Sequence, residues 1–349
     1  GAVVVMDVHN GAILAAASAP GSDPNLFSGG SDEQIAALLS DSAHPLFDRT
    51  SQMAIPPGSV FKTVTAVALL QSQAVDPYEA FECRGYLNRP DSLRCQIFVR
   101  EGRGHGDVTL LDALAQSCNV YFFHHAARMG PDPLVHWAGQ LGFGRVTGVD
   151  LPGEAAGNLP SPRSMRQRQG RDWRTGDTQM LAIGQGKLEA TPLQVARMIA
   201  AVANGGRLVT PHVAAGLGLP QLAGDQPVAA LAEISEDPIR VPPPRPIPGL
   251  KPGTLEVIRQ GLKRVVADHQ GTAHGTVYLD AIEIAGKTGT AETGSGADHA
   301  WLAGYVPADR PRLAIVVALE HAGSGAEAAG PVVRRLVLKM AQLGYFGRR

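Results

Sequence analysis

The chain has 349 residues, of which 44% are hydrophobic and 18% charged, and its formal net charge is -1. This length can bury one large core or two modest ones, and the near-neutral charge argues against a nucleic-acid partner. No apolar run reaches the ~18 residues that a membrane span requires, and no block of Lys and Arg indicates an anionic membrane surface. Because the chain begins at Gly1 on a strand-like pattern without a signal segment, we expect an excised domain.

The first predicted element is a β-hairpin. Residues 2–8 and 12–18 are β-rich runs joined by a turn that contains Asn10 and Gly11, and Asn-Gly is the strongest short hairpin signal. Residues 20–50 are polar, with one short helical patch near Ile35 to Leu39. We therefore expect a hairpin followed by a mostly irregular segment.

A helix is predicted to begin at Ser59. Pro57 and Gly58 interrupt the chain, and apolar residues then recur at helical spacing as far as Leu70. Ser59 and Lys62 are three residues apart, so their side chains share the first turn. On this stretch alone, Ser59 can be a capping residue and Lys62 a solvent-facing lysine.

The part from residue 50 to residue 215 is predicted to be mainly helical. Residues 78–106 show no sustained period, whereas residues 108–130 have the pattern of a helix pair. Residues 144–160 form a turn-rich loop, and residues 191–206 are a helix that begins with a proline in its first turn and ends at two glycines.

The remaining chain passes through an irregular excursion and returns to β-structure. Residues 216–253 contain a proline-rich run that excludes a helix or a central strand, and residues 254–268 are an amphipathic helix. Residues 281–292 alternate as a strand, residues 299–321 form a second hairpin, and a last helix begins at Pro331.

We expect one α+β domain over residues 1–349. Strands at both ends with helices between them predict an antiparallel sheet assembled from about residues 1–20 and 280–349. Helices flank this sheet, and the mainly helical part is an insertion between its two halves.

Three short motifs occur in chain order. They are S-V-F-K at residues 59–62, S-C-N at residues 117–119 and K-T-G at residues 287–289. Alone, the second can reflect local backbone hydrogen bonds and the third an ordinary strand end. As an ordered set they resemble the S-x-x-K, S-x-N and K-T-G arrangement of the penicillin-binding and serine β-lactamase superfamily.

The resemblance covers essentially the whole chain. Residues 1–18, 55–62, 117–123 and 284–292 are similar to the transpeptidase domain of monofunctional class B penicillin-binding proteins. Residues 183–196, which contain I-G-Q-G and T-P-L-Q, are similar to the elongation type, penicillin-binding protein 2-like, that works beside the rod-shape machinery. The resemblance implies the penicillin-binding/serine β-lactamase-like fold, and it implies that a membrane anchor and a pedestal domain are absent from this chain.

Ser59 is the candidate nucleophile and Lys62 the candidate base. A serine hydroxyl needs an adjacent base at neutral pH. We expect an apolar surround, the nearby Lys287 and the helix N-terminus to lower the pKa of Lys62, so that its amine can be neutral. The helix N-terminus also favours an oxyanion near Ser59.

The resemblance implies roles for the other two motifs. Ser117 relays the proton toward the leaving nitrogen, and Asn119 hydrogen-bonds the amide side chain of the substrate. Lys287 lies across the cleft and tunes Ser117 electrostatically.

The K-T-G strand is expected to hold the substrate. Thr288 and Thr290 present hydroxyls to the substrate carboxylate, and Gly289 leaves room for the acyl chain against the strand. The backbone N–H groups of Ser59 and Thr290 form an oxyanion hole, which contributes ~3 kcal/mol per donor in comparable acyl-transfer sites.

The implied function is that of a peptidoglycan D,D-transpeptidase that cross-links stem peptides through a serine acyl-enzyme and is inhibited by β-lactams. Acyl transfer requires no cofactor. The implied partner is a membrane glycosyltransferase of the elongation machinery, and the implied location is the periplasmic face of the bacterial cytoplasmic membrane, with anchoring by an N-terminal helix outside this chain.

Three rival functions share these motifs. A serine β-lactamase needs a further base over a deacylating water, for which Glu154 and Glu189 are the candidates, and we interpret both as solvated. A D,D-carboxypeptidase differs only in using water in place of the amine acceptor. A β-lactam sensor or scaffold is acylated without turnover.

The three cysteines suggest a metal site. Cys83, Cys95, His105 and Cys118 fall within one 36-residue window in the order C-x11-C-x9-H-x12-C. A Cys₃His set suits tetrahedral zinc, which would stabilise the irregular stretch and brace the active-site wall from behind. The alternatives are a Cys83–Cys95 disulfide and three unrelated buried thiols. We favour structural zinc because the disulfide leaves Cys118 and His105 unexplained.

Overall fold

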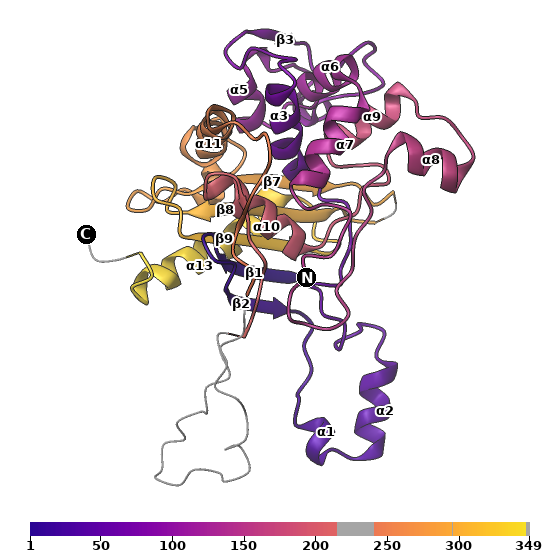
Figure 1. Cartoon of the computed structure of the whole chain (residues 1–349), viewed down its shortest axis with the longest axis vertical. Coiled ribbons are helices and arrows are strands. Elements are labelled where there is room, and N and C mark those ends of the chain that lie inside the picture. Colours follow the sequence, from indigo (N-terminus) through magenta and orange to yellow (C-terminus); the bar gives the residue numbers. More distant parts are fainter. Residues whose placement is uncertain (215–240, 295, 347–349) are drawn as a thin grey trace.

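A five-stranded antiparallel sheet forms the centre of the structure (Figure 1). The computed structural model describes residues 1–214, 241–294 and 296–346. The sheet order is β2-β1-β9-β8-β7, so the two ends of the chain build one sheet as predicted. The strands are β1 (Ala2–Asp7), β2 (Ile13–Ser18), β7 (Ala285–Ala291), β8 (His299–Val306) and β9 (Leu313–Leu319).

Strands β1 and β9 lie in the middle of the sheet and are apolar along nearly their whole length. Val4 pairs with Val316, and Met6 pairs with Ala314. Continuous rather than alternating apolar character indicates a strand that is buried on both faces. The predicted first hairpin is confirmed, and its Gly11 has a φ of +88°, a conformation that glycine adopts without strain.

Each face of the sheet covers its own hydrophobic core. On one face, α10 (Pro192–Ala203) contacts β1, β8 and β9, and every residue of this helix is buried. On the other face, α13 (Gly330–Gln342) and α12 (His274–Val277) pack against residues such as Ile315 and Leu302. The helix predicted at residues 191–206 is therefore the central element of the larger core.

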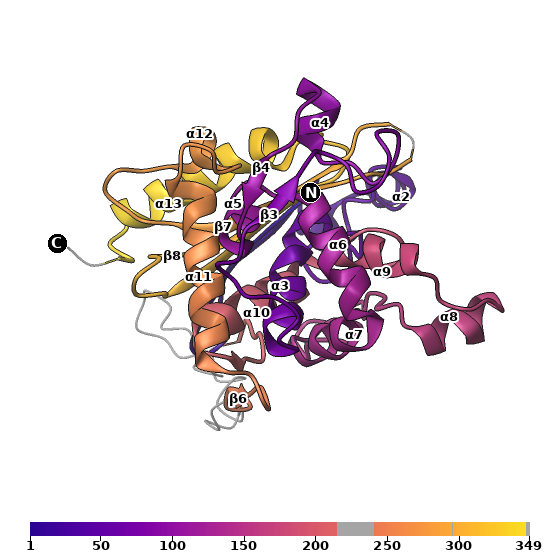
Figure 2. The same cartoon turned by 90° about the horizontal axis from the view of Figure 1, so that it is seen from above.

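A layer of helices lies above the sheet, and several of them are side by side in the view from above (Figure 2). They are α3 (Lys62–Gln71), α5 (Leu110–Ala115), α6 (Asn119–Met129), α7 (Pro131–Gln140), α8 (Pro162–Gln169), α9 (Thr175–Ala182) and α11 (Pro252–Ala267). The predicted helix pair and the amphipathic helix are confirmed as α5, α6 and α11.

Helices α7, α8 and α9 were not predicted, because their local sequence is a weak helix signal. Helix α8 has only one buried residue, Met165, and it depends on end signals. Ser161 forms a capping box with Ser164, and Gly170 ends the helix in the left-handed conformation.

The segment predicted to be irregular contains short elements. They are β3 (Phe81–Cys83), α4 (Gln96–Glu101) and β4 (Gly106–Val108), and β3 pairs with β4. Of the excursion predicted at residues 216–253, residues 216–240 lie outside the described part. The rest contains β6 (Arg245–Pro246), which forms a two-stranded sheet with β5 (Arg207–Leu208), and the start of α11.

An arm projects from the sheet near β2 (Figure 1). It carries α1 (Leu26–Gly29) and α2 (Asp32–Ser40), the second of which contains the predicted helical patch, and neither helix has a buried residue. In the described residues, no helix combines the length and the apolar character that crossing a membrane requires.

Candidate active site

The three sequence motifs meet at one cleft of about 480 Å³. Ser59, Ser117, Asn119, Thr288 and Thr290 all line it. The two motif lysines lie beneath this lining and are fully buried. The structure therefore brings together three segments that are far apart in the sequence, and it arranges their polar groups around one cavity.

Ser59 lies on a 3₁₀ turn, and this corrects the prediction that an α-helix begins there. The 3₁₀ segment is Gly58–Phe61, and α3 begins at Lys62. Side chains at i and i+3 eclipse each other in a 3₁₀ turn, so this geometry is also compatible with Ser59 and Lys62 on one side of the turn. The N–H group of Gly58 donates to the carbonyl oxygen of Gly184 (3.0 Å), which holds the turn against the I-G-Q-G loop.

Gly58 lets the serine turn approach the K-T-G strand. Its φ is +54°, and a Cβ atom there would lie 2.6 Å from the carbonyl oxygen of Thr290. A larger residue is therefore excluded both by backbone conformation and by space. This close approach brings Ser59 next to Thr290, the two residues whose N–H groups were expected to form an oxyanion hole.

Lys62 is buried, so the alternative of a solvent-facing lysine is wrong. Its Nζ donates to the carbonyl oxygen of Ser117 (2.7 Å), to Ser117 Oγ (3.1 Å) and to Asn119 Oδ1 (2.6 Å). These three acceptors match the three hydrogens of an ammonium group. A neutral amine has only two hydrogens and one lone pair, so deprotonation leaves a position on Nζ that can accept a hydrogen, and of the three groups it faces only the Ser117 hydroxyl has one to donate.

Burial lowers the pKa of Lys62 to about 8, and the neighbouring cysteines oppose this shift. Burial also lowers the pKa of Lys287 well below its usual range, with the positive charge of Lys62 adding to the effect. We had expected the apolar surround, Lys287 and the helix N-terminus to lower the pKa of Lys62, and burial is the largest cause of its shift. Repulsion between two like charges is reciprocal, so the proximity of the two lysines disfavours the charged form of both.

Ser117 occupies the turn between α5 and α6 in a strained conformation. Its φ is +57°, which is uncommon for a residue with a Cβ atom and recurs at functional sites. Cys118 follows as the N-cap of α6, where its Sγ accepts from the N–H of Tyr121 (3.4 Å). The side-chain amide of Asn119 also donates to the carbonyl oxygen of Arg94 (3.0 Å), so both ends of this amide are held within the protein.

The K-T-G motif lies on β7, the edge strand that faces the cleft. Thr288 Oγ1 lies 2.7 Å from Thr272 Oγ1, and Thr290 Oγ1 accepts from the N–H of Gly325 (3.3 Å). An edge strand has unpaired backbone groups that can bind an extended peptide as an added strand. The cleft is therefore suited to a peptide ligand.

Gly289 faces the serine turn, and this gives a further reason for its presence besides the predicted room for an acyl chain. A Cβ atom at Gly289 would lie 2.7 Å from the carbonyl oxygen of Pro57 and 3.0 Å from Val60 Cγ2. The glycine is needed so that the strand and the turn that carries Ser59 can pack together.

Two further residues of the cleft were missed by the sequence analysis. Gln185 is nearly buried and reaches the carbonyl oxygen of Thr290 (3.5 Å), and Thr272 contacts Thr288. The I-G-Q-G stretch pointed to the region of Gln185, but only as a sign of subtype. Nothing in the local sequence signals Thr272.

The two candidate deacylation bases are not among the residues that line this cleft. Glu154 is not simply solvated, because its carboxylate accepts from the N–H groups of Thr147 (2.6 Å) and Gly148 (3.0 Å) and holds that loop. Glu189 is exposed. The acidic residues that do line the cleft are Glu101, Glu292 and Asp298.

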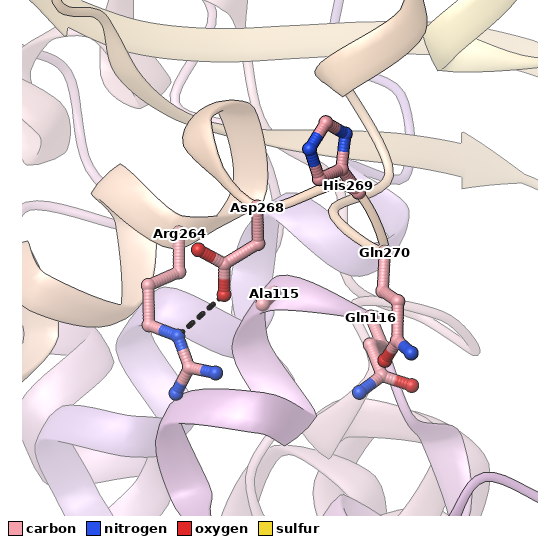
Figure 3. Close-up of a pocket in the computed structure, with 6 residues that line it drawn as sticks. All are labelled: Ala115, Gln116, Arg264, Asp268, His269 and Gln270. Atoms are coloured by element: carbon pink, nitrogen blue, oxygen red, sulfur yellow. Dashed lines mark hydrogen bonds and ion pairs between the residues drawn. The ribbon is translucent and has the colours of Figure 1, made fainter.

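A smaller pocket of about 110 Å³ adjoins the cleft (Figure 3). Gln116 and Gln270 line both cavities. Inside the small pocket, Arg264 pairs with Asp268 (2.6 Å), and the same guanidinium binds Asp112 of α5 (2.7 Å). None of the three motifs lines this pocket, so the larger cleft is the candidate site.

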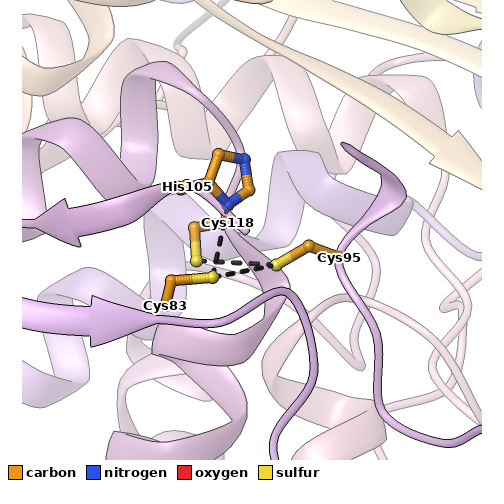
Figure 4. A group of neighbouring side chains, drawn as sticks. All are labelled: Cys83, Cys95, His105 and Cys118. Carbon is orange, nitrogen blue, oxygen red and sulfur yellow. Dashed lines mark hydrogen bonds between the residues drawn. The ribbon is translucent and has the colours of Figure 1, made fainter. Parts of the chain in front are cut away.

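Cys83, Cys95, His105 and Cys118 form a cluster at the wall of the cleft, which His105 itself lines, and the cluster can hold a metal ion (Figure 4). The sulfur of Cys95 lies 3.7 Å from that of Cys83 and 3.6 Å from that of Cys118, and Cys83 Sγ lies 3.4 Å from His105 Nδ1. In a tetrahedral zinc site with Zn–S bonds of ~2.3 Å, two sulfur ligands lie ~3.8 Å apart.

This spacing fits a metal and is longer than the ~2.05 Å of a disulfide bond, and all three cysteines are free in this structure. The cluster also adjoins two walls of the cleft, since Cys95 is the N-cap of α4 and Cys118 stands between Ser117 and Asn119.

Comparisons with known proteins identify the family of this chain. The sequence profile of the penicillin binding protein transpeptidase domain matches residues 1–338. Peptidoglycan D,D-transpeptidase MrdA of Haemophilus influenzae is 35% identical over 97% of this chain and 52% of its own length. The chain therefore spans about half the length of this curated relative.

Two solved structures are similar throughout the chain. Penicillin-binding protein PBP2 of Helicobacter pylori, in complex with MreC, has a TM-score of 0.84 at 30% identity, covering 99% of this chain and 61% of that one. Penicillin-binding protein A of Mycobacterium tuberculosis, as a ceftriaxone acyl-enzyme, has a TM-score of 0.78 at 27% identity, covering 97% and 73%. With its three motifs gathered at one cleft, the chain belongs to the penicillin-binding protein transpeptidase domain family and is of the PBP2/MrdA type.

Proposed function

We propose that residues 1–349 form the catalytic domain of a peptidoglycan D,D-transpeptidase and that Ser59 is its nucleophile. The observation that carries this proposal is the buried Lys62, which stands one 3₁₀ turn from Ser59 and binds both polar residues of the S-C-N motif. A lysine whose pKa is lowered by burial is suited to take the proton of a serine hydroxyl.

The reaction proceeds in two acyl-transfer steps. Ser59 Oγ attacks the penultimate D-Ala carbonyl carbon of a stem peptide, and its proton passes to Lys62. The N–H groups of Ser59 and Thr290 stabilise the oxyanion, and the proton passes from Lys62 through the Ser117 hydroxyl (3.1 Å away) to the nitrogen of the terminal D-Ala as its C–N bond breaks. An amine of a second stem then attacks the acyl-enzyme carbonyl, forms the cross-linking C–N bond as the Ser59 ester bond breaks, and its proton returns by the same relay to Ser59 Oγ.

The remaining site residues bind the peptide. Thr288 and Thr290 hold the terminal carboxylate, Lys287 lies buried beneath the strand near Ser117 and tunes it electrostatically, and Asn119 contacts the amide side of the substrate. A β-lactam has the same carboxylate and an acylating carbonyl, so it is attacked by Ser59 in the same way and leaves a slow acyl-enzyme.

Mass spectrometry after treatment with benzylpenicillin tests the nucleophile. The wild-type chain is expected to gain one penicillin mass on the peptide that contains Ser59, and Ser59→Ala is expected to lose the adduct while keeping its melting temperature. Ser28→Ala, an exposed serine of α1, is the matched control and is expected to label normally. Labelling of Ser59→Ala would contradict the assignment.

The fate of the acyl-enzyme separates the rival functions. A transpeptidase transfers the acyl group from a D-Ala-D-Ala donor peptide to an added amine acceptor, whereas a carboxypeptidase transfers it to water. A sensor retains the acyl group, and a β-lactamase hydrolyses penicillin rapidly. We expect slow hydrolysis of penicillin and transfer to the amine.

We also propose that the cysteine cluster binds structural zinc. Three thiols and one imidazole have their ligand atoms within 4.8 Å of one another, and zinc prefers such ligands in tetrahedral sites. This arrangement supports the proposal of bound zinc. The metal would tie β3 and α4 to the turn that carries Ser117, and so fix two walls of the cleft. The ion takes no part in acyl transfer.

Metal analysis of protein purified without chelator is expected to give one zinc per chain, and Cys83→Ser is expected to lower both zinc content and melting temperature. An intact mass under non-reducing conditions should show three reduced cysteines. Less than stoichiometric zinc together with a mass two hydrogens lighter would contradict the metal site.

The location and partners follow from the family. We propose that the full-length protein is anchored by a segment outside this chain and acts at the periplasmic face of the cytoplasmic membrane. There it would assemble with a glycosyltransferase and, as its Helicobacter pylori relative does, with MreC. Co-purification of the full-length protein with these partners tests the assembly.

A further inference from the structure

The loop between α11 and α12 connects the two sides of the cleft. It begins at Asp268 and reaches Thr272, whose N–H donates to the carbonyl oxygen of Ala115 at the end of α5 (3.1 Å). Figure 3 shows Ala115 close to this loop. Because α5 leads directly to Ser117, the backbone of Thr272 is fixed relative to the S-C-N turn.

The loop is tightly folded, so the position of Thr272 is well defined. The N–H of Gly271 donates to the carbonyl oxygen of Asp268 (2.8 Å), and the N–H of Ala273 donates to that of Val265 (3.0 Å). A Cβ atom at Gly271 would collide with the carbonyl oxygen of Val265. These contacts place the Thr272 side chain without help from a ligand.

The hydroxyl of Thr272 meets the K-T-G strand. Its Oγ1 lies 2.7 Å from Oγ1 of Thr288, and both residues line the cleft. Thr288 is only 7% exposed, and the Thr272 hydroxyl is the one hydrogen-bond partner that the described residues provide to its side chain. The contact therefore decides how the Thr288 hydroxyl is oriented.

A hydroxyl group has one hydrogen and two lone pairs, so only one of the two threonines can donate in this contact. If Thr288 donates to Thr272, its hydrogen is used inside the protein and its oxygen presents lone pairs to the cleft. A carboxylate is repelled by that arrangement. If Thr272 donates to Thr288, the hydrogen of Thr288 is free to point into the cleft.

We propose that Thr272 is a positioning residue that donates its hydroxyl hydrogen to Thr288 Oγ1 and thereby aims the Thr288 hydrogen at the terminal carboxylate of the bound peptide or β-lactam. This assignment rests on the proposed function. A hydroxyl that accepts one hydrogen bond becomes a better donor, so the Thr272–Thr288 pair binds an anion more strongly than Thr288 alone. The pair thus selects ligands that end in a free carboxylate.

The test compares benzylpenicillin with its methyl ester, which keeps the acylating ring but lacks the negative charge. The acylation rate of Ser59 is measured as a function of inhibitor concentration for wild type, Thr272→Val, Thr272→Ser and Thr276→Val. Thr276 lies in α12 and does not line the cleft, so its variant is the matched control for the loss of a nearby threonine hydroxyl.

Thr272→Val is expected to lower the second-order acylation constant for benzylpenicillin about tenfold, mainly through weaker initial binding, and to change that for the ester less than twofold. Thr272→Ser keeps the hydroxyl and is expected to restore the preference for the acid. Combining Thr272→Val with Thr288→Val should add little to the effect of Thr288→Val alone, because both act through one hydroxyl.

Equal losses for the acid and the ester would overturn the assignment, because they would show a general structural effect. Unchanged rates for both inhibitors would also overturn it. If Thr272→Val does not fold, the same comparison is made with Thr272→Ala. If the wild-type chain is not acylated at Ser59, the proposed function itself is overturned. If the wild-type chain is acylated normally and the Thr272 variants behave like it, only the assignment of Thr272 is overturned.

Discussion

At the scale of single residues, burial of a lysine decides the chemistry of this site. Lys62 has no exposed surface, and its three hydrogen-bond acceptors all come from the S-C-N turn. Desolvation penalises the charged form, so a proton leaves this amine more easily than it leaves an exposed lysine. A neutral amine does not carry this desolvation penalty, so Lys62 can stay buried after it loses its proton.

The rate of acylation should therefore depend on pH. With a pKa of about 8, Lys62 is neutral in about a tenth of the molecules at pH 7, and the neutral fraction rises as the pH increases. The second-order rate constant for acylation by benzylpenicillin should rise about tenfold from pH 7 to a plateau above pH 9. Stopped-flow or quenched labelling between pH 6 and pH 10 measures this profile.

Lys62→Ala provides the control for that profile. Its acylation should be slower than wild type by about 10²–10⁴-fold, and the rise through pH 8 should be absent. A wild-type midpoint near pH 10, or a variant that acylates at the normal rate, would remove Lys62 as the base.

At the scale of elements, the site depends on close packing of β7 against the 3₁₀ turn. Two glycines allow it, because Gly58 faces the carbonyl oxygen of Thr290 and Gly289 faces that of Pro57. Each element thereby fixes the position of the other. The separation of Ser59 from the Thr290 N–H is set by this contact, and an oxyanion hole requires that separation to be accurate.

Gly289→Ala should disturb this contact. The new Cβ atom would lie 2.7 Å from Pro57 O and close to Val60, so the turn must move away from the strand. We expect a loss of ~1–3 kcal/mol in unfolding free energy and a slowing of acylation by at least tenfold. Chemical denaturation and penicillin labelling measure the two effects.

Gly139→Ala is the matched control for that substitution. Gly139 lies in α7, and apart from its chain neighbours and the backbone of the helix itself, no atom of the described residues lies within 4 Å of the position of its missing Cβ. Alanine is the better helix former, so this variant should be equally stable or up to ~1 kcal/mol more stable, with normal acylation. Equal behaviour of the two glycine variants would contradict the packing argument.

At the scale of the whole molecule, two cores share one sheet, and the α1–α2 arm contributes to neither. The larger core contains the buried α10, and the second lies under α13. The arm has no buried residue in its helices and does not line the cleft. Its base is held separately, since Arg49 binds Glu320 (2.5 Å) and the carbonyl oxygen of His44 (3.1 Å).

Removing the arm should therefore leave the fold and the site intact. Replacing residues 22–41 by a flexible Gly-Ser linker of about eight residues keeps Arg49 and its partners. The melting temperature should change by no more than a few degrees, and acylation of Ser59 should be unchanged. By contrast, Met198 in α10 is fully buried, and Met198→Ala should lower the free energy of unfolding by ~2–5 kcal/mol. A collapse of stability in the arm deletion would show that the arm supports the core.

Much of this protein was determined by local patterns in the sequence. The hairpins, the long helices and the sheet built from both termini follow from hydrophobic periodicity and turn residues, which depend on neighbours within a few positions. The three motifs are also short, so their order alone pointed to the family. The convergence of Cys83, Cys95, His105 and Cys118 was predicted from residue types, because few arrangements explain three cysteines and a histidine in one window.

Only the tertiary structure decided the features that depend on contacts between distant segments. The burial of Lys62, the collision that a side chain at Gly289 would cause and the pairing of Thr272 with Thr288 each join residues that the local sequence does not relate. Burial and hydrogen bonding set a pKa or orient a hydroxyl through atoms within a few ångströms in space, whatever their separation along the chain. The sequence therefore determined which groups the site contains, and the packing of the helices and the serine turn against the sheet determined their protonation, orientation and spacing.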